Sequence, residues 1–392
     1  MSSPFIVGPK GDKPRSDLRV TYTPNSSNLH INLTSKVETL FGESINAQVR
    51  DVCNQLGIKT GTFDIEDFGA LPFIISARVE AVIKKAHPEI QKDALPVMKD
   101  FCMYSSSRNR FRRSRLYLPG NQAKLMVNAG IHKPDGLILD LEDSVSPAEK
   151  KDTRYIVRNA LRTLDFMGAE RMVRINQGEY GLLDLDFIVP HNVHLVLIPK
   201  VESADQVLVI DGRIKEISKA CGRKEPVYLM PILESGRGIL KALEIAEASE
   251  NNIALAIGLE DYTADIGVQR TLEGHESFFA RGMLVNAAKT ANLQAIDTVF
   301  SDVANEEGLR ASVREAKSLG FDGKGCIHPR QINPIHEEFA PSKDDVDKAL
   351  LIVEAYNEAE AKGLGVVSLG SKMIDPPVVK RALQTLKMAG KV

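Results

Sequence analysis

Two patterns of hydrophobic and polar positions divide the chain near residue 100. Residues 19–33 predict two strands around the turn "PNSSN", and residues 35–57 predict an amphipathic helix capped by Ser35. The strand "TGTFDIED" and the helix "PFIISARVEAVIKKA" follow, which completes a small α+β domain over residues 1–100. The polar, basic run "MYSSSRNRFRRS" comes next and predicts a linker, placed at 101–112, or an edge of the following domain.

After this segment, short apolar runs alternate with helix-like stretches. Continuous apolar strands between helices indicate a parallel sheet that is buried on both faces. Eight such repeats in about 230 residues predict a closed (β/α)8 barrel over 113–340. An open doubly wound sheet is the alternative, but the first strand has no GxGxxG turn and no GxxxxGK[ST] motif occurs. The predicted strands are 115–119, 136–143, 171–176, 195–199, 227–234, 253–258, 294–300 and 323–329.

Charged side chains stand at the carboxyl ends of most of these strands, where barrels of this type place their chemistry. We interpret Lys200 and Glu202 as members of ion pairs at the strand ends, without a catalytic role. For Glu234 and Asp261 we expect function instead, because two carboxylates on neighbouring strands repel unless protonated or bridged by a cation. Oxygen ligands suit Mg²⁺, whereas histidine is almost absent from these positions and zinc is therefore disfavoured. The remaining charged or polar residues at these ends are Glu142, Asp143, Arg174, Asn176 and Glu260.

Composition limits the classes of partner and the setting. A formal net charge of −2 and 43% hydrophobic residues describe an ordinary globular protein and give no reason to expect a nucleic-acid partner. The four cysteines form no CxxC pair, and no apolar stretch approaches the roughly 18 residues of a membrane span. The simplest expectation is a cytoplasmic protein without a membrane partner.

The ordered motifs "RRSRLYLPGN", "LDLEDSVSPAEK", "VRIN", "ILESGRGI", "IGLEDYTADIG" and "GSKMIDPPV" carry a resemblance. Residues 112–392 resemble the citrate lyase β subunit and its relatives, the malyl-CoA and citramalyl-CoA lyases. The stretches "INLTSKVETLFGESINAQV" and "DFGALPFIISARVEAVIKKA" are similar to the acyl carrier (γ) subunit of citrate lyase. The chain thus resembles a fusion of carrier and lyase, and the resemblance supports the barrel and adds a carboxyl-terminal helical arm or lid over 341–392.

The resemblance also implies site residues. Members of the family cleave a 3-hydroxy-acid thioester into a 2-oxo acid and a shorter thioester, with Mg²⁺ held by residues that match Glu234 and Asp261. Arg174 matches the arginine that engages the substrate, and Asp375 matches an acid supplied by a neighbouring subunit. The same motifs nominate Glu142 as a further catalytic residue and, as substrate-binding residues, Arg113, Tyr117 and Pro329.

The chemistry accounts for this set of residues. Cleavage of the carbon–carbon bond places negative charge on a thioester enolate, which a fixed arginine can offset. Protonation of the enolate carbon then requires a carboxylic acid in a sheltered site. Asp375 precedes two prolines and is equally well explained as the amino-terminal cap of the helix "PPVVKRALQTLKMAG"; only the resemblance favours catalysis.

The carrier-like domain departs from its family at one position. The family attaches a CoA-derived prosthetic group to a serine that precedes an acidic residue. In "GDKPRSDLRV", strict register places Arg15 at that position and Ser16 one residue later. Ser16 is therefore a candidate attachment site, and without modification the domain would shelter a free CoA ester or mediate assembly.

These observations predict a Mg²⁺-dependent carbon–carbon lyase that acts on a citryl-, citramalyl- or malyl-type thioester bound to CoA or to a carrier. Two alternatives stay open: a non-catalytic carrier or scaffold subunit, and a class II pyruvate aldolase. The family resemblance implies that the arm closes over a neighbour's barrel, so we expect a homo-oligomer built from trimers. A separate acyl- or CoA-transferase subunit is a further expected partner.

Overall fold

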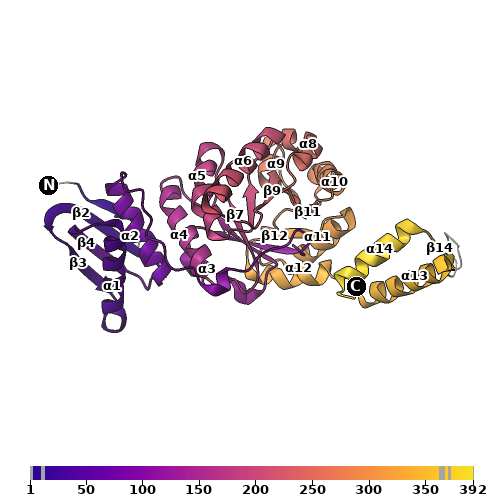
Figure 1. Cartoon of the computed structure of the whole chain (residues 1–392). Coiled ribbons are helices and arrows are strands. Elements are labelled where there is room, and N and C mark those ends of the chain that lie inside the picture. The colour runs from indigo at the N-terminus through magenta and orange to yellow at the C-terminus, as the bar shows by residue number, and fades with distance from the viewer. Residues whose placement is uncertain (1–2, 10–13, 362–366, 370–371, 392) are drawn as a thin grey trace.

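The computed structural model describes residues 3–9, 14–361, 367–369 and 372–391. Figure 1 shows three parts in chain order: a small α+β unit, a barrel surrounded by helices, and a helical arm that extends away from the barrel. The predicted fold class, a (β/α)8 barrel between a small α+β unit and a helical arm, is confirmed.

The amino-terminal unit is a four-stranded sheet covered by two helices. Its strands β1 (Phe5–Val7), β2 (Leu18–Asn28), β3 (His30–Ser35) and β4 (Thr60–Asp67) have the order β1-β2-β4-β3. Its helices are α1 (Glu38–Leu56) and α2 (Pro72–Ala86). The sheet arises because β2 and β4 alternate buried and exposed positions, which leaves one face for the helices.

Two local predictions in this unit are wrong. The "PNSSN" run is no turn but the end of β2, where the pairing with β4 shifts register between Thr23 and Asn28. Helix α1 begins at Glu38, not after Ser35, and its capping position is Val37. The hydroxyl of Ser35 instead accepts a hydrogen bond from the Val37 amide at 3.1 Å and donates one to Asp67 at 2.6 Å. Ser35 therefore closes the turn after β3.

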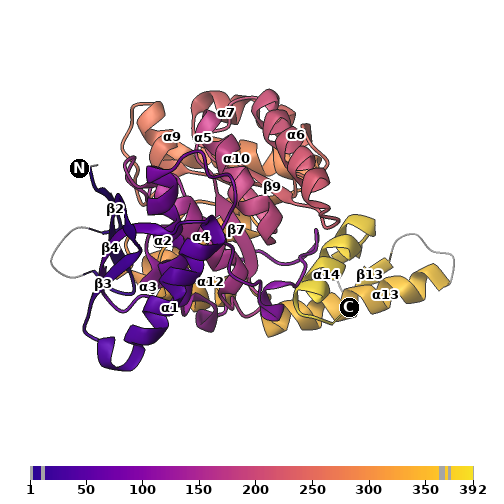
Figure 2. The same cartoon turned by 60° about the vertical axis from the view of Figure 1, so that its left-hand side comes forward.

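Helix α2 joins the small unit to the barrel. It is buried from Phe73 to Ile83 because it packs on the sheet on one side and on α4 (Lys150–Thr163) on the other. Figure 2 shows the two helices together. The Arg158 guanidinium pairs with Glu80 inside this contact, with Nη1 and Oε1 3.2 Å apart. An ion pair therefore crosses the contact between the small unit and the barrel.

The polar segment after residue 100 lies against the barrel and is not a free linker. A short 3-10 turn, η1 (Asp100–Cys102), opens it, and the Tyr104 hydroxyl then donates to the Ala169 carbonyl at 2.5 Å. Arg112 is fully buried and donates to Glu170 from Nε and Nη2, at 2.6 and 2.8 Å. The segment is therefore an edge of the barrel, at the amino-terminal ends of the strands.

Eight parallel strands close the barrel in chain order, and all eight predicted runs form strands. They are β5 (Ser114–Pro119), β6 (Gly136–Asp140), β7 (Glu170–Arg174), β8 (Leu195–Ile198), β9 (Tyr228–Leu233), β10 (Ala254–Ile257), β11 (Gln294–Asp297) and β12 (Gly323–Cys326). The helices and 3-10 turns around them are α3 (Ala123–Met126), η2 (Ala129–His132), α4, α5 (Gly178–Ile188), η3 (Val189–His191), α6 (Ala204–Cys221), α7 (Gly236–Leu240), α8 (Ala242–Glu247), α9 (Leu259–Asp265), α10 (His275–Thr290), α11 (Glu306–Leu319), η4 (Pro329–Gln331) and α12 (Ile332–Phe339).

Alternate residues of these strands build two cores, as the pleat of a barrel requires. The inner core fills the barrel with Ile138, Met172, Leu197, Met230 and Ile232, among others. The outer core lies between the strands and the helices. Because side chains fill the lower barrel, polar residues at the carboxyl ends of the strands surround an opening that leads only part of the way in.

The arm is a separate helical hairpin. Helices α13 (Lys343–Ala361) and α14 (Pro376–Met388) pack on each other around Ala349, Ala382 and Leu386, and a ribbon of β13 (Val367–Leu369) and β14 (Lys372–Ile374) lies at its far end. Figure 1 shows that this end is the part of the arm farthest from the barrel.

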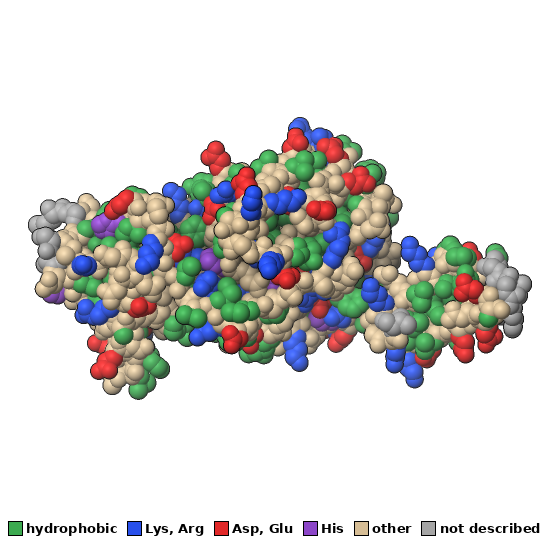
Figure 3. All heavy atoms as spheres, in the orientation of Figure 1, with side chains coloured by type: hydrophobic (Ala, Val, Ile, Leu, Met, Phe, Trp, Pro, Cys, Tyr) green, Lys and Arg blue, Asp and Glu red, His purple; other side chains and the backbone are tan. Residues whose placement is uncertain are grey.

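Charges of both signs are mixed over the face drawn in Figure 3, in keeping with the small net charge. None of the helices in the described part of the chain combines the length and the apolarity that crossing a bilayer requires.

Candidate active site

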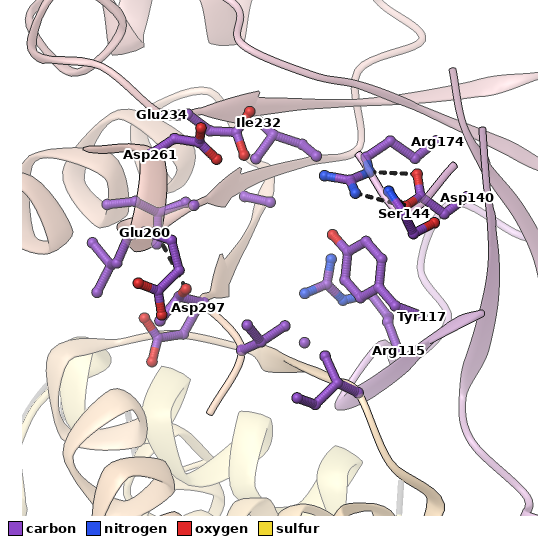
Figure 4. A pocket seen from close by; sticks show the side chains of 18 of the residues that line it. Arg115, Tyr117, Asp140, Ser144, Arg174, Ile232, Glu234, Glu260, Asp261 and Asp297 are labelled. Carbon is purple, nitrogen blue, oxygen red and sulfur yellow. Dashed lines mark hydrogen bonds and ion pairs between the residues drawn. The ribbon is translucent and has the colours of Figure 1, made fainter. Parts of the chain in front are cut away.

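A cavity of about 330 Å³ opens at the carboxyl ends of the barrel strands (Figure 4). Charged groups from six strands or the loops that follow them surround it, while apolar residues such as Ile232 and Ala256 form the rest of its wall. The charged and polar lining residues are Arg115, Tyr117, Asp140, Ser144, Arg174, Glu234, Glu260, Asp261, Asp297 and Thr298.

Arg174 ends β7 and is held from the neighbouring strand. Its Nε and Nη2 donate to the two carboxylate oxygens of Asp140, both at 2.7 Å. Its guanidinium carbon lies 5.3 Å from the centre of the Tyr117 ring, a cation–π distance. Burial lowers the pKa of Arg174, but the hydrogen bonds and charge of Asp140 outweigh burial and raise it, so the group stays cationic.

Glu234 follows β9 and is 6% exposed. Its Oε2 accepts a hydrogen bond from the Lys200 backbone amide at 2.9 Å. Burial, followed by smaller effects of the Asp261 and Glu142 charges, raises the pKa of Glu234 to about 7, although the Lys200 amide and Arg174 oppose the rise. A carboxylate in such surroundings is stabilised by a cation placed next to it.

Asp261 lies in the first turn of α9, directly after β10. Figure 4 shows its carboxylate beside that of Glu234, on the side of the cavity opposite Arg174. Lys200 Nζ lies 3.5 Å from Asp261 and 3.2 Å from both Glu142 and Asp143. The prediction that Lys200 forms ion pairs is confirmed, and these ion pairs lie at the mouth of the barrel.

Glu142 is buried behind these groups and is not part of the cavity wall. Gln177 donates to its Oε1 at 2.8 Å, and its Oε2 is 3.0 Å from Nη1 of Arg174 without hydrogen-bond geometry. Burial raises its pKa, against the charge of Arg174. Glu142 therefore contacts Arg174 and Lys200 and does not face the cavity itself.

The structure does not bring every predicted residue to the cavity. Arg113 precedes β5 at the opposite end of the barrel, where its Nε and Nη2 donate to Asp135 at 2.9 Å. Because a strand separates it from the mouth, the prediction that Arg113 binds substrate is wrong. Pro329 follows β12 at the correct end but is not a lining residue, whereas Pro119 is. Tyr117 lines the cavity as expected.

Asp375 and Ser16 lie on other parts of the chain. Asp375 is the amino-terminal cap of α14 and accepts a hydrogen bond from the Val378 amide at 3.1 Å, so its capping role is real. It lies at the far end of the arm, outside its own barrel's mouth. Ser16 has φ 57°, a left-handed conformation, and its amide donates to the Phe68 carbonyl at 3.0 Å.

Sequence reasoning missed five polar or charged residues of this cavity: Arg115, Asp140, Ser144, Asp297 and Thr298. Asp140 lies inside the apolar run "GLILDLED", two residues before Glu142. The sequence signal that could have identified it is an acid inside an apolar strand, next to the strand that ends in Arg174. Arg115 belongs to the run "RLYLP", where its spacing of two from Tyr117 places both on one face of the strand. Arg115 precedes the end of the strand, so a search of strand ends does not find it.

The residues present fit a Mg²⁺ site. Glu234 and Asp261 offer two carboxylates to one open cavity, and Mg²⁺ commonly takes one or two carboxylates, with water and substrate oxygens as its other ligands. No three His, Cys, Asp or Glu side chains in the described residues converge closely enough to hold an ion by themselves. The raised pKa of Glu234 points the same way, because a bound cation would stabilise its charged form.

Comparison with known proteins identifies the family of this chain. The HpcH/HpaI aldolase/citrate lyase model matches residues 113–329, which is more than half of the chain. The chain belongs to this family. The citrate lyase subunit beta of Haemophilus influenzae is 45% identical over 283 residues, covering 71% of this chain and 97% of that protein. Human mitochondrial citramalyl-CoA lyase is 31% identical over 299 residues, covering 73% and 88%.

A solved structure of the HpcH/HpaI aldolase/citrate lyase family agrees with the barrel. Mycobacterium tuberculosis CitE, crystallised with magnesium, acetoacetate and coenzyme A, is 29% identical, with a TM-score of 0.60 and coverage of 72% of this chain and 100% of that one. A second model, malonate decarboxylase delta subunit, matches residues 11–86, in keeping with the predicted carrier-like unit. The family prediction from the sequence motifs is confirmed.

Proposed function

We propose that this protein is a Mg²⁺-dependent lyase that cleaves a 3-hydroxy-acid thioester into a 2-oxo acid and a shorter thioester. One observation carries the proposal: a pair of carboxylates, Glu234 and Asp261, faces a fixed arginine, Arg174, across a single cavity. Family members named as citrate lyase and citramalyl-CoA lyase subunits support the reaction class.

Each side of the cavity has a chemical task in this proposal. Mg²⁺ held by Glu234 and Asp261 would act as a Lewis acid toward the hydroxyl and its adjacent carboxylate. Arg174, oriented by Asp140, offsets the negative charge that develops on the thioester carbonyl as the bond breaks. The partly apolar wall, with Ile232 and Ala256, limits water and so strengthens both interactions.

The proton that completes the reaction must come from an acid, and within its own chain Asp375 is remote. We therefore propose that the arm of a neighbouring subunit brings its Asp375 to the mouth, in an oligomer built from trimers. Ser16 is proposed as a prosthetic-group site on the carrier-like unit, and a separate transferase as a partner that loads the acyl group. The backbone at Ser16 is left-handed, a conformation in which glycine or asparagine is more usual. This unusual conformation supports a specialised role for Ser16.

Assay of the purified protein with citryl-, citramalyl- and malyl-CoA, with Mg²⁺ and with EDTA, tests the proposal. We expect one thioester to be cleaved in the presence of Mg²⁺ and none in EDTA. Cleavage of 4-hydroxy-2-oxo acids without any thioester would favour the class II aldolase. If the wild-type protein binds Mg²⁺ and CoA esters but cleaves none of them, with or without a transferase, the result would favour the carrier or scaffold role.

A further inference from the structure

Arg115 is a second cation in the cavity, deeper in the barrel than Arg174. It stands two residues before Tyr117 on β5, so both side chains point into the barrel, and Figure 4 shows its guanidinium beside the Tyr117 ring. The residue is 1% exposed and nevertheless lines the cavity. Its position makes it part of the cavity floor.

Arg115 forms no ion pair with any carboxylate of the described residues. Nη1 donates to Sδ of Met230 at 3.1 Å, a weak acceptor, and the buried Nε has no hydrogen-bond partner. No carboxylate among the described residues lies within 4 Å of the guanidinium. Ion pairs hold three other buried arginines, Arg112 to Glu170, Arg158 to Glu80 and Arg281 to Asp297. Arg171 also has no ion pair among the described residues, but it lies outside the cavity and donates to the Asn192 and Leu161 carbonyls.

Two acids that line the same cavity are already engaged elsewhere. Asp297 accepts from Arg281 and from Lys324 Nζ, the latter at 2.7 Å, and Asp140 accepts from Arg174. Burial lowers the pKa of Arg115, yet a guanidinium remains charged in proteins. An unpaired buried cation is costly, and the open side of this one is the cavity. A ligand that fills the cavity is therefore the remaining source of an anion.

We propose that Arg115 determines substrate specificity by binding a second carboxylate on the acyl part of the substrate. The inference rests on the proposed lyase function. The carboxylate next to the hydroxyl belongs with Glu234 and Asp261, so Arg115 is left for a different one. The three candidate thioesters differ in one substituent of the hydroxyl-bearing carbon: a carboxymethyl group in citryl, a methyl group in citramalyl and hydrogen in malyl.

Only the citryl substituent carries an anion that can pair with Arg115. A methyl group or hydrogen would leave the guanidinium buried and unpaired, and sites built around a polar group reject analogues that lack its partner. The protein should thus prefer the substrate whose 2-oxo acid product has two carboxylates, and it should bind the dicarboxylic product better than a monocarboxylic one.

Steady-state kinetics of the wild type and of Arg115→Met on the three CoA esters tests this proposal. In the wild type we expect the highest kcat/KM for citryl-CoA. Arg115→Met should lower that value by at least about 100-fold, the scale for breaking a buried charge pair, and change the other two less than about threefold. Arg113→Met is the matched control, since it removes a guanidinium outside the cavity and should leave the order of preference unchanged.

Two further measurements separate the possible failures. The melting temperature of ligand-free Arg115→Met should rise, because an uncompensated buried charge is removed; a clear fall would show a structural cation. Calorimetry of the wild type with Mg²⁺ should show oxaloacetate binding at least about tenfold tighter than pyruvate. Equal binding of the two acids overturns the role of Arg115 even if no thioester is cleaved. Preferential cleavage of citramalyl-CoA overturns it while the proposed lyase function stands.

Discussion

Arg174 and Asp140 form two parallel hydrogen bonds, from Nε to Oδ1 and from Nη2 to Oδ2, both 2.7 Å long. They stand at the ends of adjacent strands, β7 and β6, whose register pairs the two residues directly. Burial acts to raise the pKa of Asp140, but the hydrogen bonds and charge of Arg174 outweigh it and hold the pKa below the usual value. The guanidinium is thereby fixed before substrate arrives, which is what electrostatic stabilisation of a transition state requires.

Arg174→Lys should lose most turnover while the protein folds normally. A lysine carries the charge but cannot make the planar two-point contact with Asp140, so its ammonium would not be held in place. We expect kcat to fall by about 100-fold, in the range found when one oxyanion donor is removed. Circular dichroism controls for folding. Near wild-type kcat in this variant would contradict the role given to Arg174.

Glu234→Gln and Asp261→Asn should each abolish Mg²⁺ binding and activity. Both changes keep the size of the side chain and remove the negative charge that holds the cation. The effect is measurable without turnover, as loss of the heat of Mg²⁺ binding in calorimetry and of stabilisation by added Mg²⁺ in thermal melts. Glu244→Gln is the matched control, because Glu244 is an exposed acid on α8 outside the cavity. Full activity of both site variants at saturating Mg²⁺ would remove the metal from the proposal.

Gly258→Ala should weaken Mg²⁺ binding through Glu234. A Cβ added at Gly258 would lie 2.7 Å from Cγ and 2.9 Å from Cδ of Glu234, closer than such atoms approach, so the carboxylate must move. We expect Mg²⁺ affinity to fall at least about tenfold, the scale reported for changes around metal ligands. Gly212→Ala, on α6 with open space around it, is the control and should leave affinity unchanged.

The barrel was predictable because most of its strands are apolar runs buried on both faces, a signal that needs no long-range information. The pair Glu234 and Asp261 was predictable because strand order alone places consecutive strand ends side by side. Arg113 was misplaced because a motif does not reveal at which end of a strand a residue lies. Asp140 and Arg115 were missed because their roles depend on ion pairs between strands. Asp140 pairs with Arg174, whereas the acids around Arg115 pair with other cations, and side-chain packing across the barrel decides these pairs.

The two wrong local predictions, a turn at "PNSSN" and a helix that starts after Ser35, show that local sequence preference does not decide such positions. Asparagine, proline and serine favour turns locally, yet β2 continues through that run, and its pairing with β4 resumes at Asn28 after a register shift. Ser35 is a good cap by residue type, but its hydroxyl is engaged with Asp67 across the sheet. Tertiary hydrogen bonds outweighed local preference at both positions.

Acid should destabilise the protein partly through His194. Its Nδ1 accepts from the Arg171 amide and its Nε2 donates to the Tyr104 carbonyl, so the ring is held neutral. Burial, with Arg171 nearby, lowers its pKa from 6.5 to about 3. Below pH 6.5 the unfolded chain binds a proton that the folded protein does not, so this contribution is present above pH 6.5 and is lost as the pH falls toward 3.

The expected loss between pH 7 and pH 5 is about 2 kcal/mol from this histidine. His194→Gln should be less stable than wild type at pH 7 but should lose less stability on acidification, as measured by urea unfolding at both pH values. His132→Gln, at an exposed position, should retain the wild-type pH dependence. Equal pH dependence in His194→Gln and wild type would show that His194 is not the titrating group.

The last prediction concerns assembly and depends on the position of Asp375. Asp375 stands between β14 and α14, at the end of the arm that Figure 1 shows farthest from the barrel, whereas Glu234 and Asp261 line the barrel cavity, so a shared site requires a second subunit. Asp375→Ala and Glu234→Ala should each be inactive alone. Refolded together, they should regain partial activity, because some mouths would combine an intact metal site with an intact arm. Since Asp375 also caps α14, Asp375→Ser preserves the cap while removing the acid and controls for local unfolding. If mixtures with either variant stay inactive while wild type survives the same refolding, Asp375 does not serve a neighbouring subunit.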